Sequence, residues 1–155
     1  MRWQNSFEGA GYHPVFLDAA YARMPFATCW CVFRLPTAIA DAVESAYRKE
    51  IIAGYPELAD DAHWHPMVRR AVAVWTVDIT VALAARAAGA DRLMHSRVRP
   101  VPSMRQLLRH RWEQVAEELE SAAELPALAV VFRGLLATTE RWQVTALPRY
   151  PAFRT

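Results

Sequence analysis

The chain has little net charge and almost no lysine. Its 18 basic residues nearly balance its 16 acidic residues, which leaves a net charge of +2, and Lys49 is the only lysine. Proteins that bind nucleic acid or acidic membranes usually carry a clear basic excess, so the composition favours neither partner. With 54% apolar and 22% charged residues in a length of 155, the chain is expected to form one globular domain with a core.

Neither a secretory leader nor an uninterrupted membrane segment is expected from the sequence. The longest apolar region, residues 71–88, contains Asp78 and Arg86. A membrane helix needs about 20 mainly apolar residues, so this region predicts a core helix instead. Only two cysteines are present, Cys29 and Cys31. A disulfide between them would close a small, strained ring, so we expect free buried thiols and a cytoplasmic protein.

Hydrophobic periodicity, with proline and glycine as breaks, predicts a mostly α fold. Four main helices are expected, at residues 37–53, 66–88, 103–119 and 126–142. They follow an irregular N-terminal segment, residues 1–35, in which residues 14–23 have helical spacing. We expect a single helical domain over residues 1–142. Residues 143–155 contain two prolines and are expected to form an extended or frayed tail.

Residues that commonly cap helices stand before three of these segments. Thr37 is expected to cap the first helix, and Asp60 or Asp61 the second. Ser103 precedes the third helix and is followed at the third position by Gln106, the spacing of a capping box. These residues predict where the backbone enters each helix.

The spacing of apolar residues predicts which face of each helix points inward. For the first helix this face is expected at Ile39, Val43, Ala46 or Tyr47, and Ile51. The second helix is apolar on most sides, as expected of a central helix surrounded by others. The inward face of the third is expected at Met104, Leu107, Leu108, Arg111, Trp112, Val115 and Leu119. That of the fourth is expected at Leu128, Phe132, Leu135, Leu136 and Thr139.

A series of short motifs begins near the N-terminus, with Ser6-Phe7-Glu8 and then Gly9-Ala10-Gly11, Leu17-Asp18 and Cys29-Trp30-Cys31. In this order they resemble the aminoglycoside phosphotransferase-like family of small-molecule kinases, over about residues 6–142. The resemblance implies the helical C-terminal lobe of a protein-kinase-like fold. It also implies that Ser6 and Glu8 mark a degenerate magnesium position, with Ser6 where the family has the metal-binding aspartate. A neutral hydroxyl is a weak substitute for that carboxylate.

Other parts of a phosphotransferase are missing from the sequence. Phosphoryl transfer uses a loop over the phosphates, a lysine on the nucleotide, a catalytic aspartate and further magnesium ligands. The chain has no glycine-rich loop and no His-x-Asp-x4-Asn motif. We therefore expect the C-terminal part of an ATP-dependent small-molecule phosphotransferase that is inactive alone. In intact relatives the cofactors would be ATP and magnesium; none is expected for this chain by itself.

Two local groups suggest metal or redox chemistry. His63 and His65 lie close to Asp60 and Asp61, and histidine with carboxylate suits zinc or manganese. The alternative is a helix entry at which the aspartates cap and the histidines are exposed. Cys29 and Cys31 are separated by one residue, whereas redox pairs usually have two between them, so buried packing is favoured.

Arginines gather around the start of the third helix, at Arg97, Arg99, Arg105, Arg109 and Arg111. Such a cluster could hold a phosphate or an acidic partner. The alternative is a solvated face on which the arginines pair with Glu113 and Glu117, as the i, i+4 spacing of Arg109 and Glu113 allows.

The remaining polar candidates are His110, and His13 with Asp18, for which a structural or surface role is expected rather than acid–base chemistry. The tryptophans are expected mostly in the core.

A non-enzymatic helical binding or interaction module is the alternative function. A small-molecule substrate, a protein partner or a second copy of the chain would then be bound, the last two over the surface that an ATP lobe would cover. An exposed aromatic patch within residues 7–33 is expected in that case. A third alternative is a metal-dependent protein that uses His63 and His65.

Overall fold

The computed structural model of the chain describes residues 14–24, 33–94 and 101–153. In these ranges the fold is mostly α, as predicted, with no named strand. The elements are α1 (Val15–Ala19), η1 (Ala20–Arg23), α2 (Thr37–Ile52), η2 (Pro56–Ala59), α3 (Asp61–Gly89), α4 (Met104–Ser121), α5 (Pro126–Thr138) and η3 (Pro151–Phe153).

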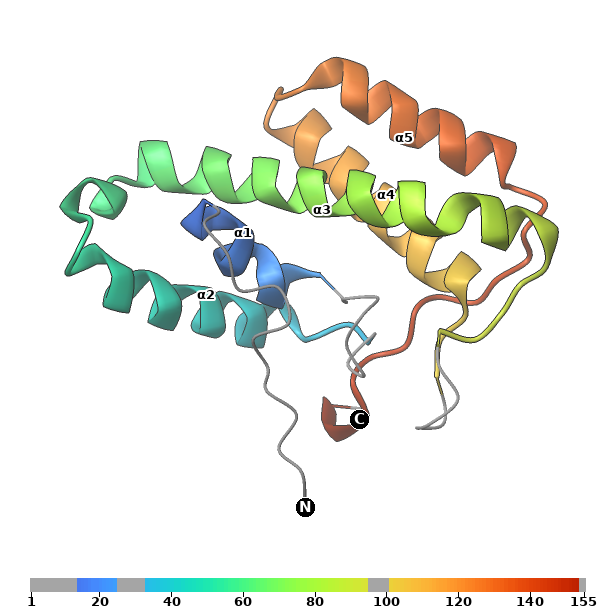
Figure 1. The fold of residues 1–155 in the computed structure, drawn as a ribbon, viewed down its shortest axis with the longest axis horizontal. Helices are drawn as coiled ribbons and strands as arrows, with labels where there is room; N and C mark the ends of the chain where they lie inside the picture. Colours follow the sequence, from blue (N-terminus) through green and yellow to red (C-terminus); the bar gives the residue numbers. More distant parts are fainter. Residues whose placement is uncertain (1–13, 25–32, 95–100, 154–155) are drawn as a thin grey trace.

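The long helix α3 is the axis of the fold (Figure 1). α1 lies against its N-terminal half, where Trp75 Nε1 donates to the Leu17 carbonyl at 2.9 Å, and α2 packs in turn on α1 and η1. α4 crosses α3 obliquely and packs against it, and α5 packs against α4. α3 is thus shared by two groups of helices, α1 with α2 and α4 with α5, and the loops and short 3₁₀ turns connect them.

The start of α3 lies earlier in the chain than predicted. Asp60 is the N-cap, and its Oδ1 accepts a hydrogen bond from the Ala62 amide at 3.0 Å. The sequence predicted Asp60 or Asp61 as the cap of this helix, which is confirmed, but it placed the first helical residue at Pro66. Pro66 instead lies inside the helix. There it leaves the carbonyl of Ala62 without its usual i, i+4 donor.

α3 is not enclosed on all sides, contrary to the expectation for a central helix. Val74, Val77 and Val81 form a stripe on one side, with exposures of 55%, 41% and 79%. The opposite side contributes Trp64, Val72 and several other buried residues to the core. By length and composition α3 could cross a membrane, but in this structure it is the central packing helix for α1 and α4.

The inward face of α2 differs from the predicted one. Ile39 and Val43 are exposed by 37% and 48%, whereas Ala40 and the carboxylate residue Glu44 are buried. The hydrophobic pattern failed here because Glu44 finds hydrogen-bond donors on other elements, which makes burial of its charge tolerable. Thr37 does not cap the helix either, since Pro36 holds the N-cap position and no side chain bonds there.

α4 matches the prediction closely. Ser103 and Gln106 form the expected capping box, with Gln106 Oε1 accepting from the Ser103 amide at 2.9 Å. All the residues predicted on its inward stripe are buried. Trp112 is 1% exposed, and its Nε1 donates to Thr80 Oγ1 of α3 at 2.8 Å. Periodicity and capping therefore agree in this helix.

The turn between α4 and α5 contains two residues with left-handed backbone, Ala123 and Leu125, at φ 52° and 45°. The Glu124 amide donates to the Leu119 carbonyl and the Ala123 amide to the Glu120 carbonyl. This is a Schellman motif in which alanine holds the position that glycine usually takes.

α5 ends at Thr138 and not at Trp142 as predicted. The carbonyls of its last turn accept hydrogen bonds from side chains: Leu135 from Thr139 Oγ1 at 2.6 Å, and Leu136 from Arg109 Nη1 at 3.0 Å. The predicted inward residue Phe132 is buried, at 1% exposure.

The segment after α5 forms no further α-helix in the described residues up to 153, and it packs against the other helices. Trp142 and Leu147 are buried at 7% and 2% exposure, and Gln106 Nε2 donates to Thr145 Oγ1 at 2.8 Å. Further along, Arg34 and Arg149 form an isolated parallel β-bridge. The tail thereby returns to the residues that precede α2.

Candidate functional site

Several residues singled out in the sequence lie outside the described ranges. These are Ser6, Glu8, His13, Cys29, Cys31, Arg97 and Arg99. The magnesium position and the cysteine pair inferred above therefore remain predictions.

The histidines near the start of α3 face different neighbours. His63 makes an edge contact with the Phe16 ring at 5.8 Å, whereas His65 Nε2 lies 3.8 Å from Asp61 Oδ1. Asp61 also accepts a hydrogen bond from Arg48 Nη1 at 2.6 Å, which lowers the pKa of its carboxyl. Within the ranges that the structure describes, no three histidine, cysteine, aspartate or glutamate side chains group as a metal site would require. Asp60 caps the helix, so the helix-entry interpretation fits this segment.

The described arginines of the predicted cluster point to three separate places. Arg105 Nε donates to the Ala87 carbonyl at 2.9 Å, and its guanidinium lies 4.9 Å from the Trp142 ring centroid. Arg109 donates to the end of α5 instead of pairing with Glu113. Arg111 is 2% exposed. Burial lowers its pKa to about 10, although the negative charge of Asp78 acts to raise the pKa. These arginines stabilise helix contacts and do not gather into one phosphate site.

A cavity of about 650 Å³ opens between η1, the start of α2, α4 and the returning tail. Its apolar wall includes Tyr21, Phe33, Val43 and Tyr150. Phe33 is only 3% exposed and makes an edge contact with the Tyr150 ring at 5.9 Å. Most of residues 7–33, in which an exposed aromatic patch was expected, lie outside the described ranges. Of the described aromatic residues there, Phe16 and Phe33 are buried, whereas Tyr21 is 49% exposed.

The polar wall of the cavity brings together residues from distant segments. Arg34 and Arg149 face each other across the β-bridge, in which the Arg34 amide donates to the Pro148 carbonyl at 3.0 Å and the Tyr150 amide to the Arg34 carbonyl at 2.9 Å. His110 and Glu118 are contributed by α4. Arg34 Nε is shielded from solvent and has no hydrogen-bond partner.

His110 is a neutral imidazole at physiological pH. Burial is the largest cause of its lowered pKa of about 4, and the positive charges of Arg34 and Arg111 lower it further. A neutral imidazole has one nitrogen that donates and one that accepts a hydrogen bond. His110 can thus contact a polar group in the cavity without adding charge.

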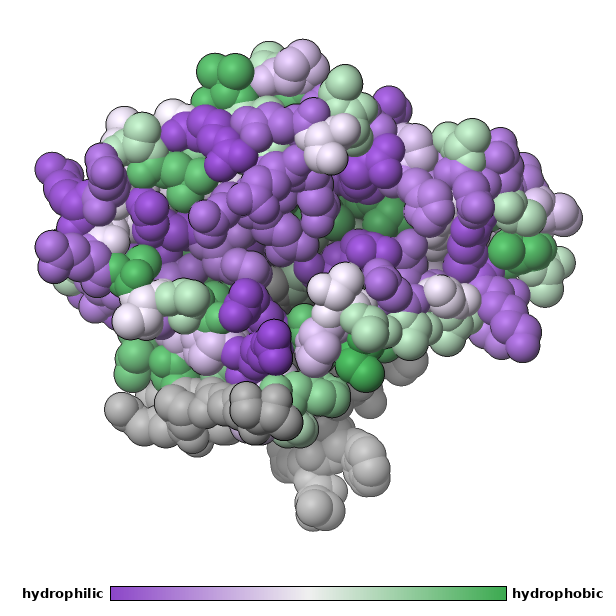
Figure 2. Space-filling view, turned by 180° about the vertical axis from the view of Figure 1, so that it is seen from behind, coloured by the Kyte–Doolittle hydropathy of each residue, from purple (hydrophilic) through white to green (hydrophobic). Residues whose placement is uncertain are grey.

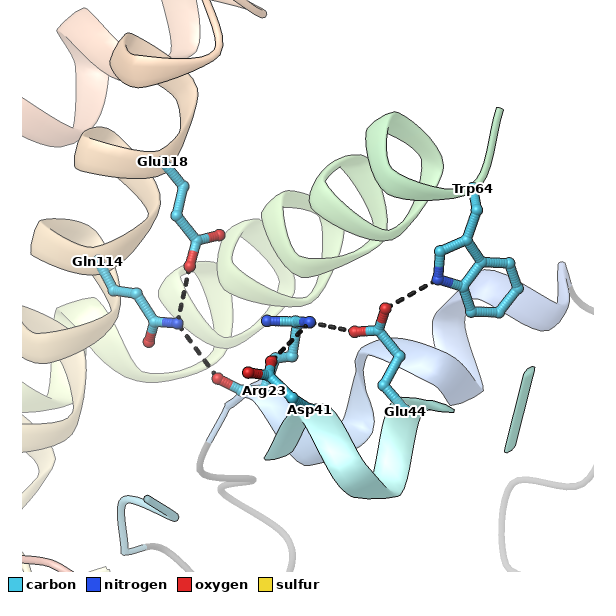
Figure 3. A network of polar contacts seen from close by, with 6 residues as sticks. All are labelled: Arg23, Asp41, Glu44, Trp64, Gln114 and Glu118. Atoms are coloured by element: carbon cyan, nitrogen blue, oxygen red, sulfur yellow. Dashed lines mark hydrogen bonds and ion pairs between the residues drawn. The ribbon is translucent and has the colours of Figure 1, made fainter. Parts of the chain in front are cut away.

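One side of the cavity is held by a buried polar network (Figure 3). Glu44 is 5% exposed; its Oε1 accepts from Trp64 Nε1 at 2.8 Å, and its Oε2 pairs with Arg23 Nε. Arg23 Nη2 reaches Asp41 Oδ1 at 3.0 Å. Gln114 of α4 donates to the Arg23 carbonyl at 3.2 Å. The network therefore ties η1, α2, α3 and α4 together beside the cavity.

The electrostatics of the network favour the ion pair. Burial alone lowers the pKa of Arg23, but the hydrogen bond and charge of Glu44, with Asp41 and Glu118, raise the pKa overall. Arg23 stays charged at every pH at which the protein is folded. The Arg23 guanidinium is therefore paired with the carboxylates of Glu44 and Asp41.

Sequence reasoning did not single out Arg34, Glu44 or Arg149. The sequence contains one signal for this site. Glu44 is a charged residue at helical spacing from Ala40 and Tyr47, the residues that share the inward face of α2 with it. No family model, curated protein or solved structure matches the chain.

Proposed function

We propose that the chain binds a small molecule in the cavity between η1, α2, α4 and the tail, and that it does not transfer phosphate on its own. The cavity of about 650 Å³ is the observation that carries this proposal. Small-molecule sites usually occupy about 300–1,000 Å³ and combine an apolar lining with a few converging polar groups. The rings of Phe33 and Tyr150 and the polar groups of Arg34 and His110 provide that combination.

The structure around the cavity supports a preformed site. The Glu44–Arg23–Trp64 contacts fix the helices beside it, and the β-bridge at Arg34 and Arg149 fixes the opposite wall. A wall held by buried hydrogen bonds loses little further freedom when a ligand binds, which favours affinity.

The resemblance of the sequence to the aminoglycoside phosphotransferase-like family supports a role for this binding module. The proposal is that it is the C-terminal part of an ATP-dependent small-molecule phosphotransferase, with a helical lobe that shapes the acceptor pocket. The residues that the structure describes offer no grouped carboxylates that fit magnesium with a nucleotide, so the proposal contains no transfer step. ATP and magnesium would be handled by parts beyond these residues, and a cytoplasmic location is proposed with this role.

A helical interaction module is the second candidate. It is favoured by the stripe of Val74, Val77 and Val81 on α3, which could face a protein partner or a second copy. The face shown in Figure 2 is mostly hydrophilic, with separate small hydrophobic patches. The cavity, which combines a volume of about 650 Å³ with apolar and polar lining residues, is the better supported site.

The test compares two matched valine substitutions. Val43 lines the cavity and is 48% exposed, while Val81 is 79% exposed on α3 outside the cavity. Compounds from a small-molecule library that raise the melting temperature of the wild type should also raise that of Val81→Trp. They should not raise that of Val43→Trp, in which the indole fills the cavity. None of the three proteins should turn over ATP.

Equal ligand effects in Val43→Trp and wild type would contradict the proposed site. Loss of self-association in Val81→Trp, measured by light scattering, would instead support the interaction module.

A further inference from the structure

We infer that the ligand of this cavity is an uncharged aromatic alcohol whose hydroxyl group donates a hydrogen bond to Glu118. The inference rests on the proposed binding function and assigns its ligand class. It comes from a row of polar side chains on α4, from an oxygen of Glu118 that has no partner, and from the charges and rings of the other lining residues.

Three polar residues of α4 line the cavity in one row. His110, Gln114 and Glu118 follow one another at i, i+4 and i+8, the spacing that places side chains on one face of a helix. All three are partly buried, whereas Trp112 and Val115 of the same helix are buried in the core. α4 therefore presents a hydrophobic face to the core and this polar row to the cavity.

Gln114 fixes the position of Glu118. Its Nε2 donates to the Arg23 carbonyl at 3.2 Å and to Glu118 Oε1 at 3.0 Å (Figure 3). An amide nitrogen has two hydrogens, and both of these neighbouring oxygens can only accept, so the orientation of the amide is determined. Glu118 is thereby held through one of its oxygens before any ligand binds.

The second oxygen of Glu118, Oε2, is available to a ligand. In the part of the chain that the structure describes it accepts no hydrogen bond, and it is not shut off from solvent as Arg34 Nε is. The nearby Arg23 guanidinium is bonded to Glu44 and Asp41 instead, although the charge of Glu118 acts on it. A carboxylate oxygen can only accept, so the group that contacts Oε2 must carry a donor hydrogen.

Side chains of both signs line the cavity, which favours an uncharged ligand. Glu118 would repel an anion, whereas Arg23 and Arg34 would oppose an ammonium group. Burial is the main cause of the lowered pKa of His110, and the charge of Arg34 adds to it, so that charge acts on this wall of the cavity. A hydroxyl group supplies the hydrogen that Glu118 can accept and adds no charge.

The remaining lining residues indicate an aromatic body. Tyr21 and Val43 are about half exposed and line the cavity together with Tyr150. Aromatic rings pack well against such side chains, at centroid distances of about 4.5–7 Å from other rings. His110 and Glu118 lie about 12 Å apart along the helix axis, so a ligand that contacts both is longer than one ring. A two-ring phenol such as naphthol matches these features.

The inference is tested by titrating the full chain with four naphthalenes that carry one substituent at the same ring carbon: naphthol, its methyl ether, naphthoate and naphthylmethylamine. Changes in amide chemical shifts measure each dissociation constant. Naphthol should bind wild type about 10- to 100-fold more tightly than the methyl ether, because the ether has no hydrogen to donate to the charged carboxylate. The anion and the ammonium compound should both bind more weakly than naphthol.

The decisive variant is Glu118→Gln. Its amide oxygen can still accept from Gln114, which leaves an NH₂ group, a donor, in place of Oε2. The preference for naphthol over its methyl ether should therefore fall to about twofold or less.

Glu117→Gln is the matched control, because Glu117 is exposed on the same helix, does not line the cavity and loses the same charge on substitution. Its preference for naphthol should equal that of wild type. The readout is a ratio of two affinities in one protein, so a general loss of stability does not change it, and the melting temperatures show that both variants are folded.

The outcomes separate the two proposals. A preference for naphthol that depends on Glu118 supports the inference. Equal binding of naphthol and its methyl ether, an unchanged preference in Glu118→Gln, or tightest binding of naphthoate or naphthylmethylamine would overturn the ligand class and leave the cavity as a binding site. If none of the four probes binds, while library compounds still bind in a way that Val43→Trp abolishes, the inference alone fails. If the library compounds do not bind in that way either, the proposed function fails with it.

Discussion

Substitution of Glu44 should destabilise the protein more than that of any exposed carboxylate around it. Glu44 is 5% exposed and accepts hydrogen bonds from Trp64 Nε1 and from Arg23. In Glu44→Ala both donors lose their acceptor, and Trp64 is completely buried, at 0% exposure, so that water cannot replace the carboxylate at the indole. Removal of one member of a buried charged pair usually costs about 3–5 kcal/mol.

The lower end of that range applies here. The Arg23 side chain is 28% exposed and keeps Asp41 as a second partner, so its charge stays partly compensated. We therefore expect a loss of about 3 kcal/mol in the free energy of unfolding for Glu44→Ala. For Glu44→Gln, whose amide oxygen can still accept from Trp64, we expect about 1–2 kcal/mol. With an m-value near 2 kcal/mol/M in urea, the Glu44→Ala midpoint should fall by about 1.5 M.

The matched control is Asp41→Asn, which removes the other carboxylate bound to the same arginine. The Asp41 side chain is 51% exposed, and exposed ion pairs contribute about 0.2–1 kcal/mol. Urea unfolding, followed by tryptophan fluorescence and by circular dichroism, measures all three variants. A Glu44→Ala loss below about 1 kcal/mol, or one equal to that of Asp41→Asn, would refute the buried network as a stabilising element.

Three further changes test other parts of the fold. Ala123→Gly should stabilise the protein by about 0.5–1 kcal/mol in thermal unfolding, because left-handed backbone at φ 52° costs alanine about 1–2 kcal/mol and glycine much less; an unchanged or lower melting temperature would argue against the Schellman turn. Ser103→Ala should cost about 1 kcal/mol in urea unfolding, since it removes the capping-box acceptor, and Ser103→Asp should recover most of it; equal stability of all three proteins would contradict the cap. His110 has a pKa of about 4 in the folded protein and 6.5 in the unfolded chain. Between these pH values the unfolded chain binds a proton at His110 that the folded protein does not bind, so the free energy of unfolding should fall by about 3 kcal/mol as the pH drops from about 6.5 to 4. His110→Gln should flatten this part of a stability–pH profile, and a profile as steep as that of wild type would show that other groups cause it.

The sequence predicted α4 well because local and long-range signals agree there. The capping box is a contact between Ser103 and Gln106, and the inward stripe follows the helical period, so both can be read within one segment. For α2 the signals disagree. The polarity of Glu44 argues for the surface, and its burial depends on Trp64 and Arg23, which are distant in sequence.

The cavity could not be predicted from the sequence for the same reason, because it depends on contacts between distant segments. Arg34, His110 and Arg149 come together only through the return of the tail beside the start of α2, and no local pattern predicts a single parallel bridge. The arginine cluster near α4 shows the converse. Arg105, Arg109 and Arg111 are close in sequence, but helical rotation directs them to different partners.

The central claim is that the cavity at Arg34, His110 and Tyr150 is a small-molecule site, and amide chemical shifts of the labelled chain during a ligand titration test it most directly. The account predicts that saturable shifts gather at residues lining the cavity and vanish in Val43→Trp. Shifts that gather instead along Val74, Val77 and Val81 of α3, or that persist unchanged in Val43→Trp, would contradict it.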